Sequence, residues 1–80
     1  MGKYTAIDIY IAVMEDPTKV SVVDASSGVK LNYIRTDYPI INGPIVVGNR
    51  MTLIVQRPNG TKTGRIYNLP SGVLNKTFNI

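Results

Sequence analysis

Four cationic side chains and one aromatic ring in the second half of the chain have the chemistry to contact nucleic acid. Guanidinium and ammonium groups pair with backbone phosphates, and a tyrosine ring can stack on an unpaired base. No Asp or Glu follows Asp37, so this half of the chain carries positive charge only. A solvated hairpin whose cations prevent wrong strand pairing is the structural alternative. The residues of this candidate nucleic-acid site are Arg50, Arg57, Lys62, Arg65 and Tyr67, with Lys76 further along the chain.

The other polar residues form no recognisable catalytic or metal site. The chain has no cysteine and no histidine, which removes thiolate chemistry together with the most common general base and metal ligand. No glycine-rich loop has the spacing and the lysine of a phosphate-binding loop, and no serine has a histidine to activate it. The carboxylates show no marked acid–base pair. We therefore expect a protein that is not an enzyme and needs no cofactor.

Charge and length set further bounds. The net charge is +4, but charged residues make up only 18% of the sequence, less than a protein bound to phosphates usually has. Eighty residues leave room for one core, so we expect a single β domain over residues 1–80. The apolar stretch at residues 7–14 is too short to span a membrane and lacks a signal-peptide cleavage site. We expect synthesis without a secretion signal and a place in the cytoplasm or in a particle.

Alternating apolar residues predict the elements that position these side chains. Residues 4–14 place β-branched Ile9, Ile11 and Val13 on one side, which favours a strand over the competing helix. Residues 19–24 and 29–35 form a predicted hairpin that turns at Gly28. A second hairpin joins residues 50–57 and 61–69 through Asn59-Gly60. Its first arm directs three side chains inward: Met51, Leu53 and Val55.

Two shorter segments complete the predicted fold. Residues 45–47 read as a short strand, and residues 73–80 read as a final strand or a frayed tail. Six to seven short strands separated by turns predict an all-β protein. The expected form is a small antiparallel β-barrel of the SH3 or OB kind, or a compact β-sandwich. No motif in these residues names a family.

Apolar residues in two places are candidates for a protein interface. Residues 36–44 lack periodicity, and an apolar loop of this kind suggests a protein neighbour, although its side chains could instead cap an open end of the core. The first strand is apolar on both faces, so we expect its outer face to contact a partner as well. The candidate interface residues are Tyr4, Tyr10 and Met14 on that outer face, and Tyr38, Ile40 and Ile41 in the loop.

Two function classes follow from these residues. The first is a structural or protein-interaction subunit of a larger assembly, for instance a homo-oligomer or a component of a virion or tail. A small inhibitor that docks on another protein belongs to the same class. The second is a nucleic-acid-binding small β-barrel that uses its basic C-terminal hairpin. The low charged fraction and the apolar candidates favour the first class, and we expect no membrane partner.

Overall fold

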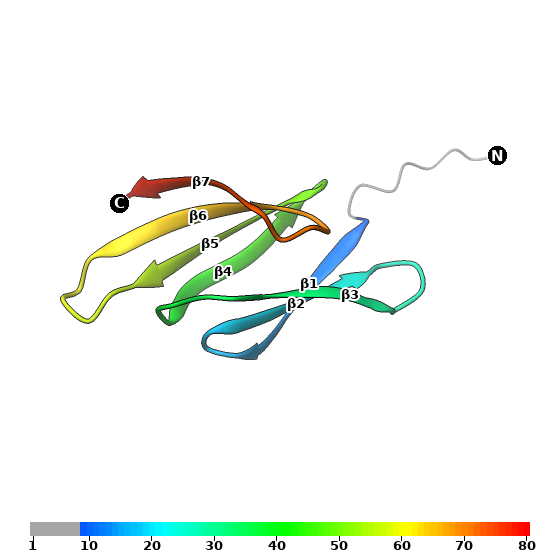
Figure 1. The fold of residues 1–80 in the computed structure, drawn as a ribbon, viewed down its shortest axis with the longest axis horizontal. Helices are drawn as coiled ribbons and strands as arrows, with labels where there is room; N and C mark the ends of the chain where they lie inside the picture. Colours follow the sequence, from blue (N-terminus) through cyan, green and yellow to red (C-terminus); the bar gives the residue numbers. More distant parts are fainter. Residues whose placement is uncertain (1–8) are drawn as a thin grey trace.

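The computed structural model describes residues 9–80 as seven antiparallel strands in two sheets (Figure 1). Each strand pairs only with its neighbours in sequence, and the two sheets do not close into one barrel within these residues. The all-β prediction is therefore confirmed. The first sheet contains β1 (Tyr10–Asp16), β2 (Lys19–Asp24) and β3 (Lys30–Arg35). The second contains β4 (Ile40–Val47), β5 (Arg50–Gln56), β6 (Lys62–Asn68) and β7 (Leu74–Asn79).

Both predicted hairpins are present, and their turns depend on glycine. Gly28 has a φ of +78° and Gly60 a φ of +90°, a region that glycine enters without steric cost because it has no Cβ. In the first turn, a carboxylate oxygen of Asp24 accepts hydrogen bonds from the backbone N–H groups of Ser26 and Ser27. These contacts fix the strand ends and hence the register of β2 against β3.

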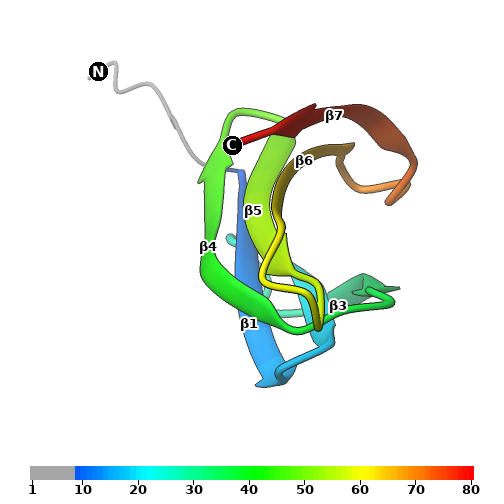
Figure 2. The ribbon, with the colours of Figure 1, turned by 90° about the vertical axis from the view of Figure 1, so that its left-hand side faces the viewer.

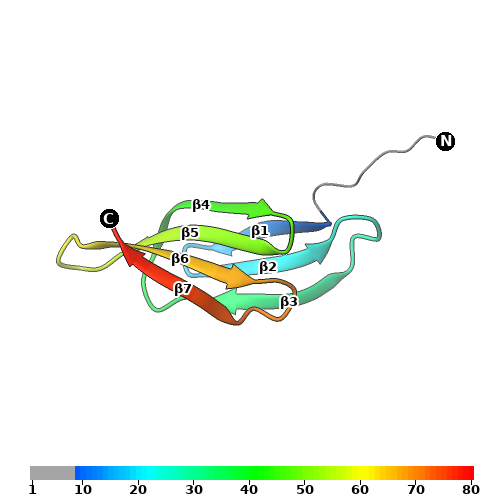
Figure 3. The same cartoon turned by 90° about the horizontal axis from the view of Figure 1, so that it is seen from above.

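The core lies between the two sheets, and the second sheet covers the first (Figure 3). The predicted inward face of β5 is confirmed, because Met51, Leu53 and Val55 are at most 1% exposed. Burial of large apolar side chains is the main stabilising contribution in a domain of this size. The other buried hydrophobic residues are Val20, Val22, Ile34, Ile40, Tyr67 and Leu69.

The expected loop at residues 36–44 is largely strand, because β4 begins at Ile40 and continues to Val47. Register shifts on both sides of Asn42 interrupt its pairing with β5. Such bulges remove the period of two that identifies a strand in the sequence. Gly43 sits within this irregular stretch with a φ of +84°, and a Cβ there would come 2.9 Å from the carbonyl oxygen of Thr52. Only glycine fits this position.

Two contacts hold the sheets together at their sides. On one side, β1 lies next to β4 although the two strands belong to different sheets (Figure 2). On the other side, the Asn32 side-chain amide donates hydrogen bonds to the carbonyl oxygens of Pro70 and Ser71, at 3.0 and 2.8 Å. The predicted final strand is confirmed as β7, which forms an edge of the second sheet and is exposed along its length.

Candidate functional site

The outer face of the three-stranded sheet carries a group of large apolar side chains, which we call the apolar face. In the antiparallel register, Ile11 of β1 lies opposite Val23 of β2, while Val13 and Tyr33 flank Ser21 in the next row. Five members are exposed by 44–55%, and Val23 is half-buried. The apolar face comprises Ile9, Ile11, Val13, Val23, Leu31 and Tyr33.

This arrangement reverses the expected orientation of the first strand. Tyr10 and Ala12 pack against the core, and Met14 shares their side of β1, although it remains 40% exposed near the strand end. The register explains the reversal, because Ala12 lies opposite Val22 and Met14 opposite Val20, which are both fully buried. The residues predicted for the outer face therefore point inward, whereas the β-branched residues of β1 point outward. Tyr4 lies outside the described residues.

A cluster of charged and polar groups interrupts the apolar face around Ser21, which lies between Val13 and Tyr33 on the central strand. Glu15 accepts hydrogen bonds from the Ser21 hydroxyl and from the Lys30 ammonium group, the latter at 2.8 Å. Lys19 lies 3.6 Å from the same carboxylate and 4.9 Å from the centre of the Tyr33 ring. The hydrogen bonds from Lys30 and Ser21 lower the pKa of Glu15 to about 2. The apolar face thus combines large apolar side chains with charged groups of both signs, and protein–protein interfaces also contain both kinds of group.

The residues predicted for the interface loop divide between core and surface. Ile40 is 8% exposed and belongs to the core, and Tyr38 is half-buried against it. For these two residues the structure matches the alternative interpretation, in which they close an open end of the core. Ile41 is 44% exposed and remains available for a contact.

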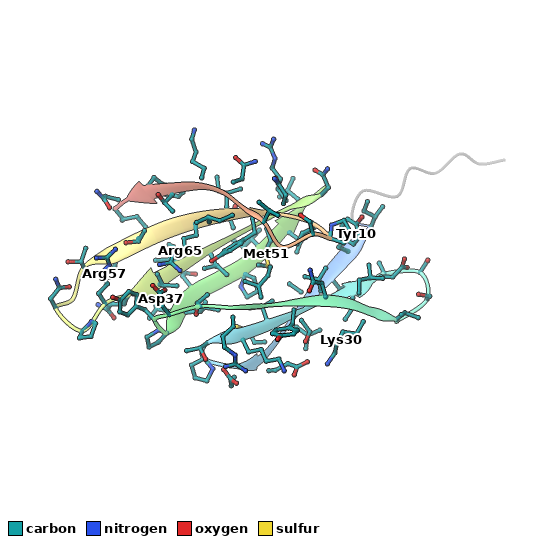
Figure 4. The ribbon with its side chains drawn as sticks, viewed as in Figure 1. Tyr10, Lys30, Asp37, Met51, Arg57 and Arg65 are labelled. Atoms are coloured by element: carbon teal, nitrogen blue, oxygen red, sulfur yellow. The ribbon has the colours of Figure 1, made fainter. Side chains whose placement is uncertain are left out.

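The predicted nucleic-acid site is split between the two faces of the second sheet. Tyr67 lies opposite Met51 and is only 6% exposed, so it cannot stack on a base. Arg65, on the same side of β6, forms an ion pair with Asp37 at 2.8 Å, and these two side chains lie near one another in Figure 4. Arg57 places its guanidinium 5.4 Å from the centre of the Tyr38 ring. Three of the five predicted residues are thus engaged within the protein.

The ion pair between Arg65 and Asp37 fixes the segment between the two sheets. The Arg65 side chain is 13% exposed, whereas that of Asp37 is 59% exposed. Its hydrogen bond from Arg65 lowers the pKa of Asp37 and raises the pKa of Arg65. A guanidinium that is paired and largely buried in this way offers few donors to a phosphate.

A second exposed group, which we call the cationic face, occupies the outer face of the four-stranded sheet. Arg50 and Lys62 of the predicted site belong to it. It also contains Phe78, which is not among the residues predicted for this site, is 41% exposed and lies opposite Gly64. The sequence alone does not show that Phe78 pairs with Gly64, because this pairing depends on the register of β6 against β7. The cationic face comprises Arg50, Ile54, Lys62, Ile66, Lys76 and Phe78.

Two other kinds of feature, a metal-binding cluster and a membrane-spanning helix, are absent from the described part of the chain. Residues 9–80 contain no group of three metal-ligating side chains. No helix long and apolar enough to cross a membrane occurs in the same residues. The chain matches no protein-family model, no curated protein and no solved structure. The apolar face and the cationic face are the two groups of exposed side chains that the structure places together.

Proposed function

We propose that this protein is a non-enzymatic structural subunit that assembles with other protein subunits, first of all with a second copy of itself, through the apolar face. The observation that carries this proposal is the gathering of Ile9, Ile11, Val13, Leu31 and Tyr33 on one sheet face, each about half exposed. A monomer seldom leaves an apolar patch larger than roughly 300–600 Å² in contact with water, and patches of that size often mark interaction sites.

The charged cluster around Ser21 supports a second copy as the partner. A two-fold interface brings the same patch of both subunits together, so the patch must complement itself. The cluster contains the Glu15 carboxylate together with the ammonium groups of Lys19 and Lys30. With both signs of charge on one face, the Glu15 carboxylate of each copy can pair with a lysine of the other after a two-fold rotation. In fold terms, the core between two sheets favours a compact β-sandwich over a small barrel.

Light scattering coupled to size exclusion tests the proposal. We expect a mass at least twice the 8.8 kDa of one chain, and a lower mass for Ile11→Lys, which places an additional charge on the apolar face. Ile45→Lys is the matched control, because Ile45 is 60% exposed on β4 and lies outside this face. Circular dichroism establishes that both variants fold. A wild-type monomer at every concentration, or an equal response of the two variants, would overturn the proposal.

A further inference from the structure

The cationic face combines positive charge with an accessible aromatic ring. Phe78 lies opposite Gly64, and a Cβ at residue 64 would come 2.2 Å from the ring Cζ, so the ring covers this glycine. Lys76 is two residues away on β7 and points to the same side. Lys62 is two residues from Gly64 on β6, hence a diagonal neighbour of the ring. A separation of two residues along a strand is about 7 Å.

Other residues of the same face extend this surface. Ile54 and Ile66 are half-buried between the cations, and Arg50 is exposed at the opposite end of β5. No Lys or Arg of this face has an acidic side chain as a neighbour within its own sheet, because residues 38–80 contain no Asp or Glu. Among the described residues, all four carboxylates that form ion pairs or turn contacts belong to β1, β2 or the segment before β4: Glu15, Asp16, Asp24 and Asp37.

We infer that the cationic face binds single-stranded nucleic acid, with Phe78 stacking on a base and Arg50, Lys62 and Lys76 contacting backbone phosphates. An exposed aromatic ring on a β-sheet, flanked by cations, is how many single-strand binders hold their ligand. The side chains between the cations are apolar or neutral and offer no pattern of base-edge hydrogen bonds, so binding depends little on base sequence.

The position of the ring favours nucleic acid over an anionic membrane. Binding at a membrane surface buries projecting apolar side chains about 5–10 Å into the boundary between headgroups and acyl chains. Phe78 instead rests on the backbone of its neighbouring strand at Gly64, so it presents a low platform that suits stacking. The inferred ligand is therefore a flexible polyanion with unpaired bases. This site lies on the opposite side of the protein from the apolar face and does not depend on it.

Fluorescence anisotropy with a labelled oligothymidylate tests this inference on the full-length protein. Three phosphate contacts predict a slope of about −2 in a plot of log affinity against log salt, or an affinity loss of roughly 20-fold between 50 and 200 mM salt. We expect Lys62→Ala and Lys76→Ala each to make the slope less negative by about 0.7. Phe78→Leu should weaken binding roughly 5- to 150-fold, and Phe78→Tyr should retain it.

Arg35→Ala is the matched control, because it removes one exposed positive charge from β3, in the other sheet. Its slope should equal that of the wild-type protein. Three outcomes would overturn the inference: no salt-dependent binding to the oligonucleotide, an equal loss of slope in Arg35→Ala, or binding to vesicles of anionic lipid but not to the oligonucleotide. Ile11→Lys should keep the wild-type oligonucleotide affinity, which separates this test from that of the assembly.

Discussion

The ring of Phe78 on β7 covers Gly64 on β6, its direct partner in the antiparallel register. Glycine normally weakens a strand because its backbone is flexible and it offers no side chain for packing. An aromatic residue on the neighbouring strand compensates by packing over the exposed backbone. Gly64 is buried as a result, although it lies on the outer face of its sheet.

Replacing this glycine is expected to disturb the pairing of β6 with β7. In Gly64→Ala, the new Cβ would lie 2.2–2.7 Å from three ring atoms of Phe78, so the ring must move. Overpacking of this kind typically costs about 1–3 kcal/mol in the free energy of unfolding. Urea denaturation of Gly64→Ala, Phe78→Ala and the double variant measures the coupling. If the two losses simply add, the ring does not lie over residue 64 in solution.

The side-chain amide of Asn32 is expected to matter for the contact between the sheets. Asn32→Ala removes two hydrogen bonds to the carbonyl oxygens of Pro70 and Ser71, for an expected loss of about 1–3 kcal/mol. Asn32→Asp should be at least as damaging at pH 7, because its carboxylate cannot donate and faces two carbonyl oxygens. Thermal unfolding followed by circular dichroism compares the two. A stable Asp variant would contradict this geometry.

Truncation of the core should be far more costly than truncation at the surface. Leu53 is 1% exposed, and Leu53→Ala removes buried methyl groups and leaves a cavity, for an expected loss of about 2–5 kcal/mol. Ile45 is 60% exposed, so Ile45→Ala should change the free energy of unfolding by about 0.5 kcal/mol or less. Chemical denaturation measures both values. Equal losses would show that the inward face of β5 is wrongly assigned.

Acid should destabilise the protein through carboxylates that hold a proton less tightly in the folded state. The pKa of Glu15 is lowered to about 2 by hydrogen bonds from Lys30 and Ser21, and the pKa of Asp37 is lowered by Arg65. A lowered pKa stabilises the folded protein above the ordinary carboxyl pKa of about 4, and this contribution is lost as the pH falls toward the folded-state value.

The corresponding experiment compares Glu15→Gln with the wild-type protein between pH 6 and pH 2. We expect the free energy of unfolding to fall below about pH 4.5 in both proteins, but less steeply in Glu15→Gln, which has lost one of the groups that titrate. Urea denaturation at several pH values provides the comparison. Identical pH profiles would mean that Glu15 makes no such contacts in solution.

The strands and turns could be predicted from sequence because their signals are local. Alternating residues identified β5 with its inward face, and Gly28 and Gly60 marked the hairpin turns. Only part of β4 can be predicted from its residues, since bulges around Asn42 break the period of two. A bulge depends on the partner strand, and a single strand's residues do not encode it visibly.

The faces of strands with apolar residues on both sides could not be predicted in the same way. Ile66 and Tyr67 are adjacent, so one must point inward and the other outward, and alternation cannot choose between them. The choice depends on the partner: Tyr67 lies opposite fully buried Met51. The same ambiguity on β1 led to the wrong orientation for Tyr10. Long-range register therefore decided which residues form the candidate sites.

The uneven placement of charge gives this molecule an electric dipole. The positive charges of Lys and Arg balance the negative charges of Asp and Glu over β1–β3. In β4–β7 and their connections, every charged side chain is positive. In the field of any polyanion, the resulting torque turns the four-stranded sheet toward the source before contact is made. A molecule captured in this orientation shows its three-stranded sheet to the solution. In the assembly that we propose, a second copy arriving later would meet an apolar face already turned toward it.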